Sequence, residues 1–269
     1  MKILYMYVVL LLLASVQIVN AQDLIYVIKV QGTIKIAETG EPIKTNDKVS
    51  LNEKLKFESD GAKALVYSTQ RGRMVLEKKK AVETGGSEIL YYVKENLLPV
   101  KAVAATRSVS IFNNPQDIRT YFNSEYLLLD GAYFKVNENV FPLSDQRFFY
   151  IRYTYKGEKI NKKLDYDGNK VIFDKKELLK VDENPISAEK ATDFKLFYYN
   201  RDKEISAPLH KINFVFAPKQ QLKAELSALQ EVLEKTGKNR VDMKQEITDY
   251  IVSTYGKFCK KCLYNDLDI

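Results

Sequence analysis

The 269-residue chain has no tryptophan, one histidine and two cysteines, and this limits the kinds of catalytic, metal and disulfide sites that it can form. With only Cys259 and Cys262, both near the end of the chain, no disulfide framework holds the fold, so stability must come from a hydrophobic core. His210 has no Ser or Cys nucleophile pattern beside it, and we expect it to be structural. The motifs G-x-S-x-G, H-E-x-x-H, P-loop and dinucleotide fingerprint are all missing. We therefore predict no catalytic residue, no cofactor and no metal ligand.

Long apolar runs are also scarce, and the one that exists lies at the start of the chain. Lys2 precedes the run Ile3–Val16, and Val19-Asn20-Ala21 follows it. This order is typical of a secretory signal peptide over residues 1–21, with cleavage after Ala21. The alternative is an uncleaved membrane anchor, but this run is shorter than the roughly 20 residues that span a bilayer.

Export is the first functional expectation that follows. No cysteine lies near the cleavage site, so the sequence does not support a lipoprotein anchor. No later apolar run approaches spanning length, and we expect at most peripheral membrane contact after cleavage. The predicted location is the periplasm or the cell surface of a bacterium.

The charge is modest and spread along the chain. Lys and Arg number 42 against 35 Asp and Glu, a formal charge of +7. We expect no nucleic-acid partner, because export removes the usual ligand and no basic stripe with a known motif is present. Weak attraction to anionic envelope polymers or lipid headgroups remains open. The hydrophobic content of 45%, with 12% aromatic residues, is ample for a packed core.

Residues 22–80 show the pattern of a small all-β module. Short alternating strands between Leu24 and Leu76 are separated by turn residues every 8 to 12 positions. The turn signals are Thr39-Gly40-Glu41-Pro42, Asn46-Asp47 and Ser59-Asp60-Gly61. We predict a β roll or small barrel here.

Residues 24–77 resemble the periplasmic β-domain of the FecR-like family. The segments that carry the resemblance are Val30-Gln31-Gly32-Thr33-Ile34, the stretch 40–49, the stretch 57–64 and Arg73-Met74-Val75-Leu76. Asn46 stands where the family has a Gly before the Asp, and Asn tolerates the same left-handed turn. The matching positions are turn and core positions, so the resemblance implies a fold and no active site. Signalling members of the family carry an N-terminal cytoplasmic part and a membrane span, and this sequence shows neither.

The remainder of the chain divides into four segments. Residues 81–120 are interpreted as a connector with one or two strands and a loop at Asn113-Asn114-Pro115. Residues 121–217 contain about seven strands, including Phe148–Tyr155, which predicts a β-sandwich-like module. Within it, Asp130-Gly131 predicts a hairpin turn.

Residues 218–256 change to a helical period. Leu222, Leu226, Leu229 and Leu233 share one face, and a second pattern follows from Met243 to Thr254. Pro218 suits a helix start and Gly237 a helix end, so we predict an antiparallel α-helical hairpin. Its apolar stripe is expected to pack on the second β module; self-association through a short helical seam is the alternative.

The tail 257–269 carries the one candidate reactive motif, Cys259-Lys260-Lys261-Cys262. We predict a structural disulfide between the two cysteines. Thiol-redox use of this spacing normally sits at a helix N-terminus after a strand, whereas here the motif follows a predicted helix. A metal site would need about two more ligands to complete a tetrahedron.

Taken as a whole, the sequence favours a mainly β, exported, non-enzymatic protein that binds or assembles in the cell envelope, with an envelope protein or polysaccharide as partner. One alternative is an exported hydrolase that uses a carboxylate pair, which a close pair with one raised pKa would favour. The other is a membrane-anchored periplasmic sensor, if the signal is not cleaved. Tyr150, Tyr153 and Tyr155 could form a sugar or peptide platform, but we expect them to fill the two faces of one strand.

Overall fold

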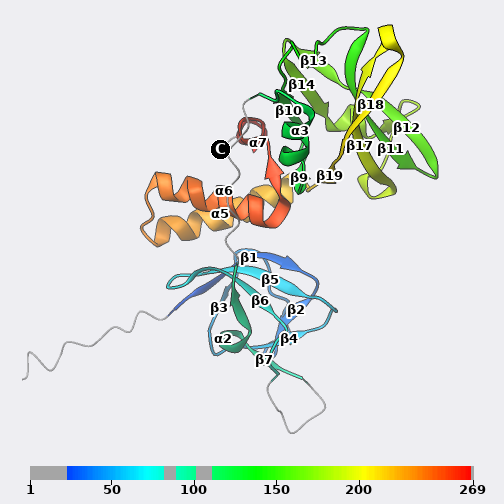
Figure 1. Ribbon diagram of the computed structural model, residues 1–269. Helices are drawn as coiled ribbons and strands as arrows, with labels where there is room; N and C mark the ends of the chain where they lie inside the picture. Colours follow the sequence, from blue (N-terminus) through cyan, green and yellow to red (C-terminus); the bar gives the residue numbers. More distant parts are fainter. Residues whose placement is uncertain (1–22, 82–88, 101–110, 268–269) are drawn as a thin grey trace, which may run out of the picture. The chain divides into compact units, whose positions relative to one another are not determined.

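A computed structural model describes residues 23–81, 89–100 and 111–267 (Figure 1). The predicted signal peptide, residues 1–21, lies outside the described residues. Among those described, 42% lie in strands and 27% in helices, which confirms the prediction of a mainly β fold. The chain divides into two compact units, Met1–Pro99 and Val100–Ile269. No helix in the described ranges is long and apolar enough to cross a membrane.

The first unit consists of short antiparallel strands in two sheets. One has five strands in the order β3-β1-β5-β6-β8 and the other has the order β2-β4-β7. The elements are β1 (Ile25–Gln31), β2 (Ile34–Ile36), β3 (Lys48–Val49), β4 (Lys54–Phe57), β5 (Lys63–Ser68), β6 (Gly72–Glu77), β7 (Tyr91–Tyr92), α2 (Val93–Asn96) and β8 (Leu97–Pro99). The first six strands coincide with those that the alternating pattern predicts.

The turn predicted at Asn46-Asp47 is confirmed. Asn46 has a φ of 78°, the left-handed conformation in which Asn replaces Gly at little cost. The Asp47 carboxylate accepts a hydrogen bond from the Lys44 backbone N–H at 2.6 Å and so closes the turn. The turn leads directly into β3, at the edge of the five-stranded sheet.

The described parts of the segment interpreted as a connector, residues 81–120, belong to the two units. β7, α2 and β8 complete the sheets of the first unit, and Asn96 anchors them. Its buried side chain accepts hydrogen bonds from the backbone N–H groups of Lys79 and Lys80 and donates to two carbonyls. The segment thus holds two strands, in line with the expected one or two, but strands of two or three residues are too short for the pattern to assign them to the sheets of the first unit. Asn114 caps helix α3 (Pro115–Tyr121), which belongs to the second unit.

The second unit contains two antiparallel sheets that share one core, beside the small antiparallel pair β15-β16. Their orders are β10-β14-β13 and β12-β11-β17-β18, and residues 121–217 hold eleven strands in all, more than the predicted count of about seven. The elements are β10 (Gly131–Lys135), β11 (Arg147–Tyr155), β12 (Glu158–Lys163), β13 (Asp165–Asp167), β14 (Lys170–Asp174), α4 (Lys175–Leu178), β15 (Lys180–Val181), β16 (Asn184–Pro185), β17 (Ala191–Asn200) and β18 (Ile205–Lys211). Phe134 and Phe173 from one sheet and Phe149, Ile151 and Leu196 from the other lie in a single buried cluster.

A third, parallel sheet shows that the predicted hairpin at Asp130-Gly131 is wrong. β9 (Glu125–Leu127) does not pair with β10; it lies between β19 (Asn213–Val215) and β20 (Lys257–Phe258), parallel to both. The run Tyr126–Leu129 is buried throughout, as is typical of a strand covered on both faces. Gly131 instead begins β10 and pairs with Asp174.

The helical pair predicted for residues 218–256 is present. α5 (Lys219–Lys235) and α6 (Arg240–Tyr255) pack together, and Gly237 ends the first helix with a φ of 70°. Asn239 caps α6 by accepting hydrogen bonds from the N–H groups of Val241 and Asp242. α6 also contacts β9 and β20, so the pair is attached to the parallel sheet.

Candidate functional sites

The candidate site around the two cysteines begins at a glycine that no other residue can replace without strain. Gly256 follows α6 with a φ of 89°, and a Cβ there would lie 2.2 Å from the carbonyl oxygen of Glu125. The absence of a side chain lets the chain turn into β20 directly against β9. Lys257 pairs with Tyr126 and Phe258 with Leu127.

Lys257 fastens this short strand to helix α3. Its ammonium group donates to the carbonyl oxygens of Thr120 at 3.0 Å and Tyr121 at 2.8 Å, and to Asn123 Oδ1 at 2.9 Å. The two carbonyls belong to the last turn of α3, where a cation is favoured. Burial lowers the pKa of Lys257. All three N–H groups of the ammonium donate hydrogen bonds, so the role of Lys257 is to hold β20 against the end of α3.

The cysteines follow immediately and form a disulfide. Cys259 is the residue before helix α7 (Lys260–Leu267), and its sulfur accepts a hydrogen bond from the Cys262 backbone N–H at 3.3 Å. The motif comes after helix α6, as expected, but the two-residue strand β20 lies between them. The order is strand, Cys259, and then helix α7 with Cys262 in its first turn.

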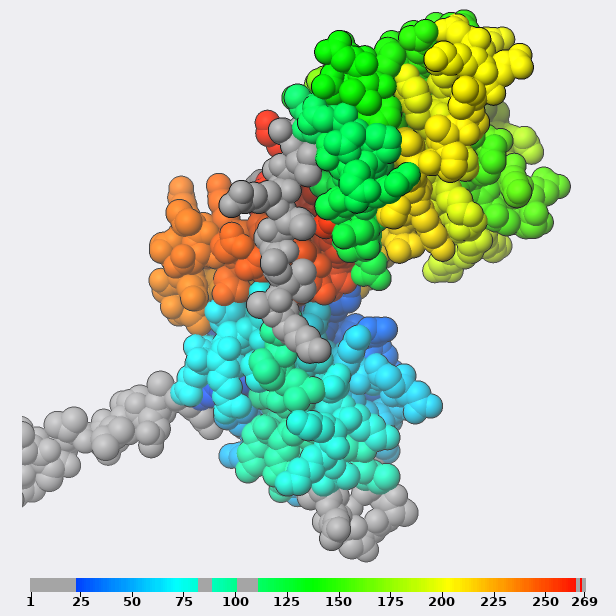
Figure 2. Space-filling model, viewed as in Figure 1, coloured from blue at the N-terminus to red at the C-terminus, as the bar shows by residue number. Residues whose placement is uncertain are grey.

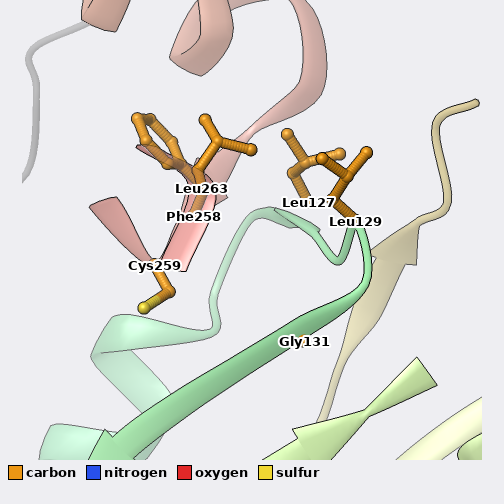
Figure 3. A pocket seen from close by; sticks show the side chains of 6 residues that line it. All are labelled: Leu127, Leu129, Gly131, Phe258, Cys259 and Leu263. Carbon is orange, nitrogen blue, oxygen red and sulfur yellow. The ribbon is translucent and has the colours of Figure 1, made fainter. Parts of the chain in front are cut away.

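Figure 3 shows the immediate surroundings of Cys259, which are apolar. The small hollow beside it is lined by Leu127, Leu129, Gly131, Phe258, Cys259 and Leu263. The space does not admit a water molecule, so it is no ligand pocket. The sulfur of Cys259 points away from the side chains of Leu127 and Leu129 (Figure 3). In the described part of the chain no three His, Cys, Asp or Glu side chains gather as a metal site would need.

His210 lies on β18, with its ring Nε2 3.2 Å from the carbonyl oxygen of Phe122, the residue that ends α3. The contact joins β18 to the end of that helix. This is the environment of a structural histidine, with a main-chain partner.

Glu225 is a buried carboxylate that the sequence analysis did not single out. It lies on α5, is 1% exposed, and accepts hydrogen bonds from Tyr250 (2.8 Å), Tyr255 and Gln221 (2.8 Å). Burial raises the pKa of both tyrosines far above the usual range, and the Glu225 charge adds to this. The tyrosines therefore stay protonated and hold α5 against α6. Only the position of Glu225 beside the apolar stripe could have indicated its burial.

Two described carboxyls have a displaced pKa, and it is lowered in both. The first cause is a hydrogen bond, which Lys180 donates to Glu183 and Lys195 donates to Asp193. A general acid needs the opposite displacement.

The outer face of the four-stranded sheet carries a different cluster. The rings of Tyr150 and Phe197 stack with centroids 4.9 Å apart and an interplanar angle of 11°. The Arg152 guanidinium lies over the Phe197 ring at 4.8 Å. Tyr153, one position on, is 1% exposed in the core. Tyr150 and Tyr153 thus fill opposite faces of β11, as we expected.

Cations surround this stack on the same face. Cross-strand pairing places Lys163 opposite Tyr150, Asn161 opposite Arg152, and Lys159 opposite Thr154. On the other side Lys195 pairs with Arg152, and Lys211 with Lys195. We call this set the cationic face: Tyr150, Arg152, Lys159, Asn161, Lys163, Lys195, Phe197 and Lys211. In Figure 2 the residues of β18, in yellow, lie at the surface of the second unit.

Some of these charges are neutralised and others are not. Asp193 pairs with Lys195 at 2.8 Å and Lys211 at 3.6 Å, and Asp145 pairs with Lys163 at 3.2 Å. Arg152 instead donates to Asn161 Oδ1 at 2.8 Å and to the Tyr150 hydroxyl at 3.3 Å. Within the described residues it has no carboxylate partner, so the centre of the face keeps a net positive charge.

Comparison with protein-family models, curated proteins and solved structures finds no match for this chain. The FecR-like resemblance of the first unit therefore stays a prediction, and function must be argued from the sites themselves.

Proposed function

We propose that this protein is exported to the periplasm or the surface of a bacterium and binds an acidic polysaccharide of the envelope without transforming it. The observation that carries the proposal is Arg152, held flat against the stacked Tyr150–Phe197 pair at the centre of the cationic face. No carboxylate neutralises it within the described residues.

The chemistry of this face suits a polymer with repeated carboxylate or phosphate groups. A guanidinium presents a planar set of donors that matches an anionic group in a bidentate manner. Asn161 and Phe197 already fix the Arg152 side chain, so little side-chain entropy is lost when an anion binds. Lys159 and Lys163 lie on the neighbouring strand β12, where successive units of one chain could reach them. Once one unit of the polymer is bound, the next units are held at high local concentration, so several weak contacts together give a higher affinity than any one of them.

Calorimetric titration of the mature chain with polygalacturonate, and with neutral dextran of similar length, tests the proposal. We expect binding to polygalacturonate alone, weakened by added salt because exposed charges are screened. Arg152→Gln should weaken it at least about tenfold, which equals about 1.4 kcal/mol. Lys238→Gln, an exposed lysine in the loop between α5 and α6, is the matched control. Equal binding of dextran, or unchanged binding by a folded Arg152→Gln variant, would refute the proposal.

Export is tested separately. The mature chain should begin at Gln22, because the predicted signal ends at Ala21. The intact mass of the protein recovered from the envelope measures this. A full-length chain retained in the membrane would favour the anchored sensor instead.

A further inference from the structure

We propose that the Cys259–Cys262 disulfide is a thiol–disulfide exchange site that oxidises dithiols. The argument rests on the order of elements around it: strand β20, then Cys259, then helix α7 with Cys262 in its first turn. This goes beyond the binding role and does not depend on it.

The position of Cys259 favours the reduced form of the pair. Its sulfur already accepts the Cys262 N–H, the bond that a capping side chain makes at the start of a helix. A thiolate at this point would be stabilised by that N–H, by the positive end of α7 and by the exposed Lys260 and Lys261. Stabilising the thiolate makes the disulfide easier to reduce, and therefore a stronger oxidant.

The scaffold keeps Cys259 in place after the bond breaks. β20 is paired with β9, Gly256 sets the turn before it, and Lys257 is held by three acceptors. The capping geometry therefore does not depend on the disulfide itself.

A purely stabilising purpose explains the disulfide less well. Only two residues separate the cysteines, and closing so small a loop removes little entropy from the unfolded chain. The cross-link therefore adds little to the stability of the fold.

The exchange proceeds in two balanced steps. A thiolate of the incoming dithiol attacks the sulfur of Cys259, the Cys259–Cys262 bond breaks, and Cys262 leaves as a thiolate that takes up a proton. The second thiol of the substrate gives up its proton and attacks the mixed disulfide. The substrate leaves as a disulfide, oxidised by two electrons, and Cys259 is released as the capped thiolate. The protein ends as the two-electron-reduced dithiol.

The first test is the equilibrium of the full chain with reduced and oxidised glutathione, quantified by alkylation and mass spectrometry. The same chain unfolded in urea is the reference, because it has the same cysteines and lysines but no helix or strand. We expect the equilibrium constant for reduction to be at least tenfold larger in the native protein. A ratio below ten overturns the proposal, since the fold would then not favour the reduced pair.

The second test separates the two cysteines. In Cys262→Ser the remaining Cys259 should react with iodoacetamide at pH 6 at least tenfold faster than Cys262 does in Cys259→Ser. Lys260→Gln/Lys261→Gln in the Cys262→Ser background should slow Cys259, and Lys238→Gln should not. Equal rates for the two cysteines overturn the proposal. The double variant Cys259→Ser/Cys262→Ser should melt within about 5 °C of the wild type, because a larger shift implies well over 1 kcal/mol.

Discussion

The two units of this protein have cores of different composition. The core cluster of the first unit is aliphatic: Ile25, Val27, Ile34, Leu55, Val66 and Leu76 are among its members, and no aromatic side chain is. The cluster of the second unit contains nine: Phe112, Phe122, Tyr126, Phe134, Phe141, Phe149, Tyr153, Phe173 and Phe194. Phe57 packs against the first cluster and touches Tyr91, with ring centroids 5.2 Å apart; Tyr91, Tyr26 and Tyr67 are buried but lie outside that cluster.

The connectivity of the sheets does not explain this difference, because non-consecutive strands pair in both units; in the first unit only β5 and β6 pair as consecutive strands. Small branched side chains fill the first core. Large rings in edge-to-face contact fill the second. The comparison predicts that damage to the second core is the more severe.

The largest loss of stability is expected from Phe173→Ala. Phe173 is completely buried, and its ring contacts the rings of Phe122, Phe134 and Phe214. Removing the ring should lower the free energy of unfolding by about 3–5 kcal/mol. Hydrogen exchange should show the loss in β10–β18 while β1–β6 stay protected. Leu55→Ala, equally buried in the first core, is the matched variant and should affect β1–β6 alone. Loss of protection throughout by either variant would mean that the cores are not independent.

The second-largest loss of stability is expected from Gly256→Ala, which changes the residue between α6 and β20. The unfavourable backbone conformation costs about 1–3 kcal/mol, and overlap with the Glu125 carbonyl adds to it. Gly237→Ala is the control, because it also has a positive φ but nothing lies near its absent Cβ. Urea denaturation of both variants measures the difference. Equal losses would show that the contact with Glu125 is unimportant.

Asp47→Ala should weaken the first unit by about 0.5–1.5 kcal/mol, the value of one hydrogen bond. The lost bond is the one from the Lys44 N–H that closes the turn. Asp60→Ala, at an exposed turn position, should change stability less. Thermal unfolding measures both, and an unchanged midpoint for Asp47→Ala would contradict the assigned turn.

The smallest effect is expected from Tyr153→Phe. The buried Tyr153 hydroxyl has no hydrogen-bond partner among the described residues, so losing it should be neutral or should stabilise by up to about 1 kcal/mol. Tyr198→Phe is the contrast, because Tyr198 donates to the Pro142 carbonyl at 2.7 Å and should lose stability. Urea denaturation compares them. A clear loss for Tyr153→Phe would reveal a partner for the hydroxyl.

Tyr153 also predicts a pH dependence. Burial raises its pKa to about 12, so the folded protein favours the neutral phenol. This contribution is present below the ordinary value of about 10 and is lost as the pH rises through 12. The wild type should therefore lose stability relative to Tyr153→Phe over that interval. Denaturation measured at a series of pH values tests this; a stability difference between the two proteins that does not change with pH would contradict the raised pKa.

Local patterns predicted the local parts of this fold well. The alternation from Ile25 to Leu76, the Asn46 turn and the two helices of residues 218–256 were all visible in the sequence. β12 was missed because Glu158–Lys163 is almost entirely polar, and β18 because Pro208 interrupts an edge strand. The partners of β9 could not be predicted, because pairing between distant strands leaves no local pattern.

The candidate sites were predictable to different degrees. The cysteine pair was evident from its spacing, but the strand Lys257–Phe258 before it was too short to recognise. No sequence pattern marks Arg152, because its neighbours Phe197, Asn161 and Lys195 come from other strands and meet it only through cross-strand register.

The parallel sheet also constrains the order in which the second unit can be completed. β9 pairs with β19 on one side and β20 on the other, and both come later in the chain. The hydrogen bond from Lys257 to the Thr120 carbonyl joins residues 137 positions apart. Until β20 has emerged from the ribosome or a translocation channel, β9 can pair with β19 alone. Synthesis must pass Phe258 before this sheet can close. A chain halted a few residues earlier would leave one edge of β9 unpaired, and unpaired strand edges make incomplete chains prone to aggregation.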